Sequence, residues 1–180
     1  MAMNKINSYS KLLGAVHLMI FAPTSSLGRH HNNNPNHKLA LMSKMPNVNS
    51  TEWSILLHKR MNSNFKDGQY GLVGGHLENG ETIIEAGVRE AKEEADLIIN
   101  HSDLEIISSI HRHSGDREYI DFFVRCIHYQ GEPHNMEPNK CSDLRFFPLN
   151  ALPPSLIDHI HLGIHNSLNG VHFHEISKTI

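Results

Sequence analysis

Residues Gly75–Leu97 read GHLENGETIIEAGVREAKEEADL, and this stretch decides both the fold and the chemistry expected of the chain. Glu90, Glu93 and Glu94 lie three and four positions apart after a glycine-rich turn. On a helix, residues at these spacings are surface neighbours, so their like charges repel by roughly 0.2–0.5 kcal/mol per pair. We therefore expect a positive group to bind these glutamates.

The positive group that these side chains favour is a hard divalent cation. Mg²⁺ in proteins is usually held by a few carboxylates together with substrate phosphates and water. Gly71, Gly74 and Gly75 stand just before the glutamates, and glycine permits close backbone approaches that other residues resist. The pattern predicts that the loop and the helix form one site.

The stretch resembles the Nudix box, Gx5Ex7REUxEExGU, of the Nudix hydrolase family, in which U is a bulky aliphatic residue. A lone pair of glutamates on a helix is usually a solvated face, but here seven positions match at fixed spacing. The resemblance extends from about Trp53 to about Asn169. The matching positions are Gly75, Glu81, Arg89, Glu90, Glu93, Glu94 and Leu97.

The chain departs from the box at three positions. Asp96 replaces the late glycine, Ala91 is small for an aliphatic position, and Val73 replaces a proline that often precedes the two glycines. Asp adopts the left-handed conformation more readily than most non-glycine residues. We expect a small loss of stability at Asp96 and an intact charge pattern.

The resemblance implies an α/β protein with the Nudix fold, an α/β/α sandwich with a mixed β-sheet. It also implies Mg²⁺, or alternatively Mn²⁺, as the cofactor. Glu81 and Arg89 are expected to pair and brace the loop against the helix. The general base is expected among Glu93, Glu94 and Glu137. The implied metal ligands are the Gly75 carbonyl, Glu90, Glu93, Glu94 and Glu137.

Glu137 is included because the segment 130–149 resembles the family's loop that returns a further glutamate to the metal site. Glu132 in the same loop is the competing choice, and a single glutamate in a polar loop is weak evidence. Leu144–Pro154 resembles the strand and turn that precede the last helix in many members.

The implied reaction is cleavage of the diphosphate linkage of a nucleoside diphosphate derivative. Resemblance around GLVGGHLENGE and EPNKCSDLRFF favours a nucleoside triphosphate, including oxidised purines, cleaved to monophosphate and pyrophosphate. The chain lacks the downstream proline that marks many ADP-ribose members. Cleavage of ADP-ribose or dinucleoside polyphosphates, and a non-catalytic nucleotide-sensing module, stay open as alternatives. Phe122 and Asp158 are the candidates for substrate binding, although strand aromatics are commonly core and helix carboxylates are commonly solvated.

Composition agrees with one Nudix domain over residues 1–180. The chain is 39% hydrophobic and 19% charged, which suits a single core. Its formal net charge of -3 gives no reason to expect a nucleic-acid polymer as a partner. Cys126 and Cys141 do not make a disulfide framework, so we expect both to be reduced in a cytoplasmic protein. The oligomeric state is not predicted.

The apolar run LLGAVHLMIFA, residues 12–22, superficially resembles a signal peptide. His17 interrupts it, Ala22-Pro23-Thr24 is a poor cleavage site, and the run is too short to span a membrane. We expect a buried strand and no membrane anchor. Residues 23–50 are rich in Asn, Ser, His and Pro, which favours a flexible insertion, with a short strand at 39–42 as an option within it.

Three further patterns predict secondary structure. Thr82 and Glu85 can form a capping box that begins the box helix. Residues 54–60, 104–113 and 118–129 read as strands because they are rich in β-branched and aromatic residues. Residues 155–169 have helical periodicity.

The chain has 16 histidines, including the pairs His30/His31, His159/His161 and His172/His174. We expect none of these pairs to join a cysteine or carboxylate cluster at metal-ligand spacing.

Overall fold

The computed structural model describes residues 11–27, 45–126 and 128–176. Within them, one seven-stranded sheet has the order β3-β2-β1-β5-β4-β7, and β6 pairs with β2. The strands are β1 (Leu12–Pro23), β2 (Trp53–Arg60), β3 (Tyr70–Gly71), β4 (Leu104–Ser114), β5 (Arg117–Cys126), β6 (Cys141–Pro148) and β7 (Phe173–Ile176). The helices are α2 (Ile83–Ala95) and α3 (Asp158–Leu168), with short 3-10 turns η1 (Thr24–Ser26), η2 (His101–Asp103) and η3 (Leu149–Ala151).

The sheet is mixed, as predicted. β1 runs parallel to β5 from Leu12 to Ile20 and then pairs antiparallel with β2 at its end. β4 and β5 form an antiparallel hairpin, and β7 adds to β4 in parallel. β2 pairs antiparallel with both β3 and β6.

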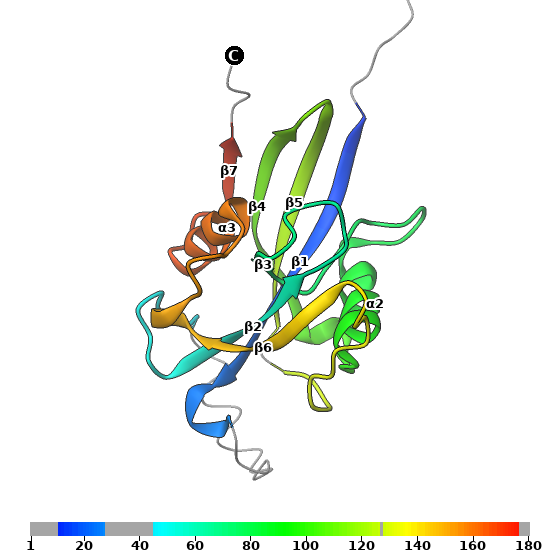
Figure 1. The fold of residues 1–180 in the computed structure, drawn as a ribbon. Coiled ribbons are helices and arrows are strands. Elements are labelled where there is room, and N and C mark those ends of the chain that lie inside the picture. The colour runs from blue at the N-terminus through cyan, green and yellow to red at the C-terminus, as the bar shows by residue number, and fades with distance from the viewer. Residues whose placement is uncertain (1–10, 28–44, 127, 177–180) are drawn as a thin grey trace, which may run out of the picture.

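Side chains of β1 alternate between two cores because successive residues of a strand point to opposite faces. Val16, Leu18 and Ile20 belong to the core under α2, whereas Met19 and Phe21 belong to the core that contains α3 residues. All five are at most 1% exposed. Figure 1 shows α2 and α3 on opposite sides of the sheet. The predicted α/β/α sandwich is therefore confirmed.

The apolar run at 12–22 forms β1, which confirms the predicted buried strand. Neither described helix has the length and apolar content that a membrane span requires. Most of the predicted insertion, including the optional strand at 39–42, lies outside the described residues.

The last helix is shorter than predicted. Ser155–Ile157 pair with β3 because the Tyr70 N–H donates to the Ser155 carbonyl and the Ile157 N–H donates to the Tyr70 carbonyl, each at 2.9 Å. Leu156 thus forms an isolated bridge with Tyr70, Ile157 is extended, and α3 begins at Asp158. Strand β7, which follows α3, was not predicted.

Candidate active site

The glycine loop after β3 lies along the middle of β1. The Val16 N–H donates to the Gly75 carbonyl and the Leu18 N–H donates to the Val73 carbonyl, both at 2.8 Å. Gly74 has φ 150°, and a Cβ there would lie 2.0 Å from the Val16 carbonyl oxygen. The loop can approach β1 this closely only because position 74 is glycine.

Helix α2 begins and ends as its sequence indicates. The Thr82 hydroxyl accepts a hydrogen bond from the Glu85 N–H at 3.2 Å, and the Glu85 carboxylate accepts from the Thr82 N–H at 2.7 Å, so the capping box is confirmed. Asp96 ends the helix in the left-handed conformation, φ 56° and ψ 27°. Ala91 and Ala95 are fully buried against the sheet. This orientation fixes which face of α2 carries the carboxylates.

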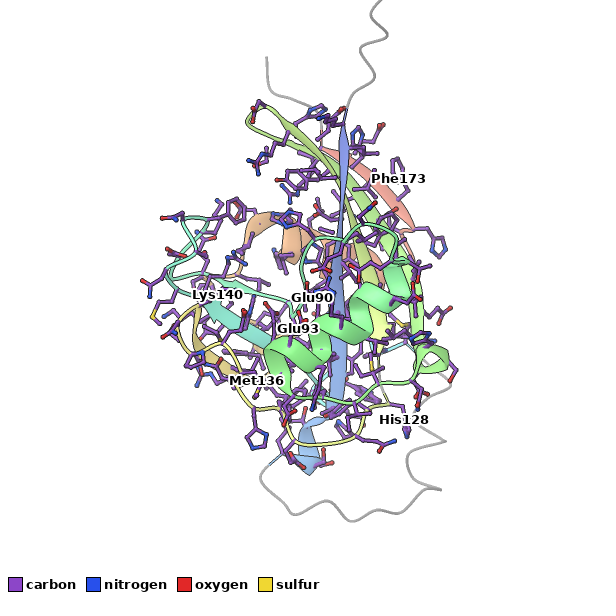
Figure 2. All side chains as sticks on the ribbon, turned by 90° about the vertical axis from the view of Figure 1, so that its right-hand side faces the viewer. Glu90, Glu93, His128, Met136, Lys140 and Phe173 are labelled. Atoms are coloured by element: carbon purple, nitrogen blue, oxygen red, sulfur yellow. The ribbon has the colours of Figure 1, made fainter. Side chains whose placement is uncertain are left out.

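Glu90 and Glu94, one turn apart, both face the glycine loop. The Gly74 N–H donates to Glu94 Oε2 at 2.9 Å, and a Cβ on Gly75 would lie 2.2 Å from Glu90 Oε1. Glu93 points elsewhere: its side chain is 56% exposed and does not line the cleft beside the other two. Figure 2 shows Glu90 and Glu93 along α2. The structure thus places two of the three box glutamates, Glu90 and Glu94, beside the glycine loop, and the third on another side of the helix.

Arg89 holds the loop and the helix together. It pairs with Glu81 through Nε at 3.1 Å and through a terminal nitrogen at 2.8 Å. It also bonds Glu90 at 2.8 Å and Glu93 at 3.1 Å, and donates to the His76 carbonyl at 3.2 Å. These bonds hold the pKa of Glu81 below its usual range. Arg89 therefore fixes the position of Glu90 relative to the loop.

The loop between β5 and β6 docks on the C-terminal end of α2. The last carbonyls of a helix lack helical partners, and here the His134 N–H donates to the Ala95 carbonyl at 2.9 Å and the Met136 N–H to the Glu94 carbonyl at 3.2 Å. In Figure 2 the loop with Met136 and Lys140 lies beside this end of α2. The docking carries Glu137 to the cleft.

Glu137 and Glu132 occupy different environments in this loop. Glu137 is half-buried, lines the cleft, and bonds the Lys140 ammonium at 2.7 Å. Glu132 is exposed and does not line the cleft. Of the two carboxylates weighed from the sequence, only Glu137 lies with Glu90 and Glu94.

The three carboxylates at this end of the cleft disfavour one another's charge. Burial, reinforced by the carboxylates of Glu90 and Glu137, raises the pKa of Glu94 to about 8. Burial also raises the pKa of Glu90, although Arg89 opposes the effect. His58, 3.6 Å from Glu94, has its pKa lowered to about 4 by burial, so it is a neutral neighbour. His58 therefore does not compensate the negative charge of Glu94.

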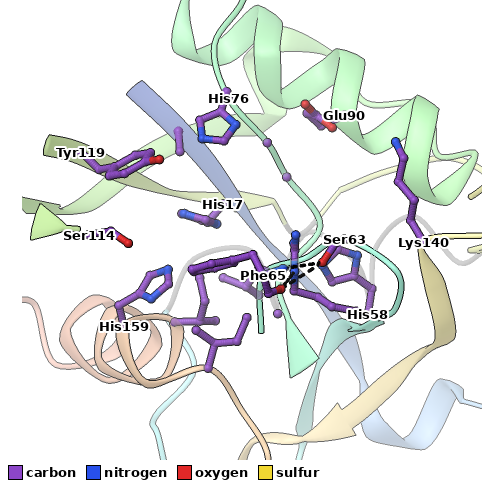
Figure 3. Close-up of a pocket in the computed structure, with 18 of the residues that line it drawn as sticks. His17, His58, Ser63, Phe65, His76, Glu90, Ser114, Tyr119, Lys140 and His159 are labelled. Atoms are coloured by element: carbon purple, nitrogen blue, oxygen red, sulfur yellow. Dashed lines mark hydrogen bonds between the residues drawn. The ribbon is translucent and has the colours of Figure 1, made fainter. Parts of the chain in front are cut away.

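The cleft that these side chains line has a volume of about 810 Å³. Figure 3 shows Glu90 and Lys140 at one end and Tyr119, Ser114 and His159 at the other. A cleft of this size can hold a nucleotide-sized molecule.

A buried polar network forms the far end. Asp121 is fully buried and binds His17 Nε2 at 3.1 Å and the Arg112 guanidinium through two nitrogens. The Arg112 guanidinium also stacks over the Tyr119 ring, 4.4 Å from its centroid. The sequence patterns did not predict this network. The sequence does show a polar or charged residue within each strand: His17 and Asp121, each between apolar neighbours in β1 and β5, and Arg112 in β4.

The two predicted substrate-binding residues do not line the cleft. Phe122 packs against the core under α2, since it alternates with Asp121 and Phe123 on β5. Asp158 has a side chain that is 96% exposed, with Lys66 4.0 Å away. Its neighbour His159 faces the cleft instead.

Sequence spacing places none of the three histidine pairs in a cysteine or carboxylate cluster, but the fold brings His159 close to one carboxylate. His159, His17 and Asp121 offer ligand atoms within 4.8 Å of one another, although no sequence spacing indicates it. Because Arg112 occupies both oxygens of Asp121, we interpret this group as a hydrogen-bonding network and not as a cation site. His30/His31 lie outside the described residues.

A family model described as the NUDIX domain matches residues 46–165, two thirds of the chain. The chain belongs to the Nudix family. An ADP-ribose pyrophosphatase from Methanocaldococcus jannaschii is 41% identical over 106 residues, which are 58% of this chain and 60% of that protein. The chain thus matches less than two thirds of the relative's length.

Solved structures show the same fold at low identity. A MutT Nudix hydrolase from Burkholderia pseudomallei has a TM-score of 0.63 and 18% identity, over 90% of this chain and 99% of that one. The Nudix domain of Shewanella oneidensis NrtR, solved with ADP ribose, has a TM-score of 0.53 and 16% identity, over 87% of each chain. At these identities the likeness concerns the fold alone.

Proposed function

We propose that this Nudix protein is a divalent-cation-dependent hydrolase that cleaves the diphosphate linkage of a nucleoside diphosphate derivative. The observation that carries the proposal is the meeting of Glu90, Glu94 and Glu137, from a helix and a distant loop, beside a glycine loop at one end of a cleft. Such a cluster is costly without a cation because like charges at one site oppose ionisation. A bound cation would remove that cost.

The residues present fit Mg²⁺ or Mn²⁺. Carboxylate and carbonyl oxygens are the hard ligands that these ions prefer. Glu90, Glu94 and Glu137 would supply carboxylates, and Gly75 would supply its carbonyl, which has a second lone pair beyond the one that Val16 uses. Glu93, which also matches the family's box, stays a predicted ligand, although its carboxylate bonds Arg89 outside the cleft. When bound, the cation polarises phosphoryl oxygens and lowers the pKa of water.

The protein's own groups then have separate roles. Arg60 and Lys140 line the cleft near the carboxylates and are suited to phosphate oxygens. Glu137 has two carboxylate oxygens, so one can contact the cation while the other takes the proton of the attacking water as general base. We assign the base to Glu137 because Glu90 and Glu94 both contact the glycine loop, which places them as ligands. Glu94 and Glu93 are the other candidates for that base.

For the substrate, we place ADP-ribose first. The 41% identical relative named as an ADP-ribose pyrophosphatase supports this choice at least as well as the box-flanking sequences support a nucleoside triphosphate. The triphosphate stays the second candidate. Tyr119 and Phe65 line the cleft and offer aromatic surface to either substrate's base.

Product analysis separates the candidates. The protein with Mg²⁺ is incubated with ADP-ribose, dinucleoside polyphosphates, and normal and oxidised nucleoside triphosphates. ADP-ribose cleavage gives AMP and ribose 5-phosphate, whereas triphosphate cleavage gives a monophosphate and pyrophosphate. Selective turnover of one class assigns the substrate. A folded protein that binds a nucleotide but cleaves none would contradict the hydrolase proposal and favour a sensing module.

Glu137→Gln tests the assignment of the base, with Glu132→Gln in the same loop as the matched control. We expect a loss of about 10²–10⁴-fold in kcat for the first variant and near-normal turnover for the second. If Glu137→Gln retains near-normal kcat, as expected of Glu132→Gln, another carboxylate must act as the general base.

A further inference from the structure

A second group of metal-binding side chains lies outside the cleft, on the β4–β5 hairpin. Figure 1 shows this hairpin extending past both helices. His111 and His113 lie two residues apart on β4, so their side chains share one face of the sheet. Glu118 on β5 is the cross-strand partner of His113. The three side chains therefore lie close together.

The geometry of the three groups is that of metal ligands. The Nε2 atoms of both histidines approach the same carboxylate oxygen, Glu118 Oε1, at 3.5 Å for His111 and 3.6 Å for His113. These distances are long for a hydrogen bond between such groups, which is normally about 2.7–3.2 Å. Ligand bonds of about 2.0–2.2 Å to Zn²⁺ in tetrahedral geometry place neighbouring ligand atoms roughly 3.3–3.6 Å apart. All three ligand atoms lie within 4.8 Å of one another.

A fourth side chain orients one of these ligands. Glu175 on β7 is the register partner of His111, and its Oε1 lies 3.5 Å from His111 Nδ1. Histidines that bind metals through one ring nitrogen usually donate the N–H of the other to a carboxylate or carbonyl, which fixes the tautomer. Glu175 lies on the Nδ1 side of His111 and can take that role when a metal is bound, while Nε2 of His111 faces Glu118 Oε1.

Arg112 and Arg117, the arginines that adjoin these residues in the sequence, face away from this group. Arg112 alternates with His111 and His113 on β4, and it binds Asp121 on the cleft face. Arg117 alternates with Glu118 and interacts with Tyr119, which also lines the cleft. Their charge is therefore turned away from a cation on the opposite face of the sheet.

We propose that His111, His113 and Glu118 form a binding site for a transition-metal ion such as Zn²⁺, with water as the fourth ligand. The side chains of the three residues are 25%, 31% and 23% exposed, so an ion and its water can enter from solvent. Two imidazoles and a carboxylate suit Zn²⁺ and its neighbours in the first row, whereas Mg²⁺ prefers oxygen ligands. The ion would link β4 to β5 at the hairpin and does not depend on the reaction proposed for the cleft.

The test is Zn²⁺ binding by untagged protein, measured by competition with a chromogenic chelator in a large excess of Mg²⁺ that saturates the carboxylates of the cleft. The chain carries other surface histidines, so the control is His161→Asn, at an exposed position of α3. We expect one site that loses at least 100-fold in affinity in His113→Asn and in Glu118→Gln. Glu175→Gln should weaken the site by about 10–100-fold, and His161→Asn should leave it unchanged.

Co²⁺ provides a readout that protein stability alone does not change. The parent protein should develop an intense visible absorption typical of four-coordinate Co²⁺, and His113→Asn and Glu118→Gln should not. Thermal unfolding of the variants in EDTA establishes that they are folded. If His113→Asn does not fold, the isosteric variant Glu118→Gln provides the test. Retention of the Zn²⁺ affinity and of the Co²⁺ absorption in a folded variant, or an equal loss in His161→Asn, would overturn the proposal.

Discussion

Gly75→Ala should impair catalysis while leaving the fold in place. Gly75 does not have a positive φ, so the backbone accepts alanine and the effect is steric. The new Cβ would lie 2.2 Å from Glu90 Oε1 and 2.8 Å from its Cδ. Contacts of a Cβ below 3.0 Å are not found in real proteins, so the carboxylate must retreat by about 0.8 Å. Arg89 resists that movement because it bonds the same oxygen at 2.8 Å.

A displacement near 1 Å in a catalytic constellation can cost about 10²-fold in rate. We expect kcat of Gly75→Ala to fall by about 10–100-fold and the Mg²⁺ concentration for half-maximal activity to rise. The assay is steady-state hydrolysis over a Mg²⁺ titration, with thermal unfolding alongside. Gly87→Ala is the matched control: it makes the same change on α2, where the nearest atoms are flexible leucine side chains at 3.1 and 3.3 Å. Normal kcat and normal Mg²⁺ dependence in Gly75→Ala would refute the contact between the loop and Glu90.

Three further predictions concern stability. Asp96→Gly should raise Tm, because relief of the left-handed strain by about 1 kcal/mol outweighs an exposed ion pair with Lys92; a lower Tm would contradict this. Gly163→Ala should destabilise the fold by about 1–3 kcal/mol in urea unfolding, since its Cβ would lie 1.9 Å from Phe123 Cζ; stability equal to that of the parent would contradict the close packing of α3. Burial lowers the pKa of His159 to about 3. Below about pH 6.5, His159 therefore binds a proton in the unfolded state but not in the folded state. The free energy of unfolding falls as the pH drops from about 6.5 towards 3. His159→Gln should reduce the loss between pH 6.5 and 5 by about 1–2 kcal/mol, and an unchanged pH dependence of urea unfolding would exclude this role.

Local sequence predicted the parts of the fold that local interactions determine. Thr82 and Glu85 are three residues apart, so their reciprocal hydrogen bonds depend on helix geometry alone. Asp96 adopts the left-handed conformation predicted from its place in the box. The burial of β1 on both faces agrees with its nearly continuous apolar sequence.

Long-range contacts explain what was not predicted. Residues 155–169 have helical periodicity, but the hydrogen bonds of Ser155 and Ile157 to Tyr70 keep the first three of them out of the helix. The network of His17, Arg112 and Asp121 joins three strands whose register is set by the whole sheet. No spacing within one segment indicates such a contact.

For the box carboxylates too, local spacing predicts one part of the arrangement and packing determines the rest. Spacing indicates that Glu90, Glu93 and Glu94 are neighbours on one helix, but not which of them faces the cleft. The burial of Ala91 and Ala95 decides this, because it turns Glu90 and Glu94 towards the glycine loop and leaves Glu93 with Arg89. The sequence of β5 makes Phe122 a candidate for base stacking, but its register in the sheet places it on the α2 side.

The measurement that tests the proposed function most directly is hydrolysis by Glu94→Gln across the substrate panel with Mg²⁺. The amide keeps the volume of the side chain and an oxygen that can accept the Gly74 hydrogen bond, so the variant should fold and have a Tm close to that of the parent. It should lose most of kcat on whichever diphosphate the parent protein cleaves, because the proposed cation site loses one of its carboxylates. Near-normal turnover by a folded Glu94→Gln protein would contradict a cation-dependent active site built on Glu90, Glu94 and Glu137.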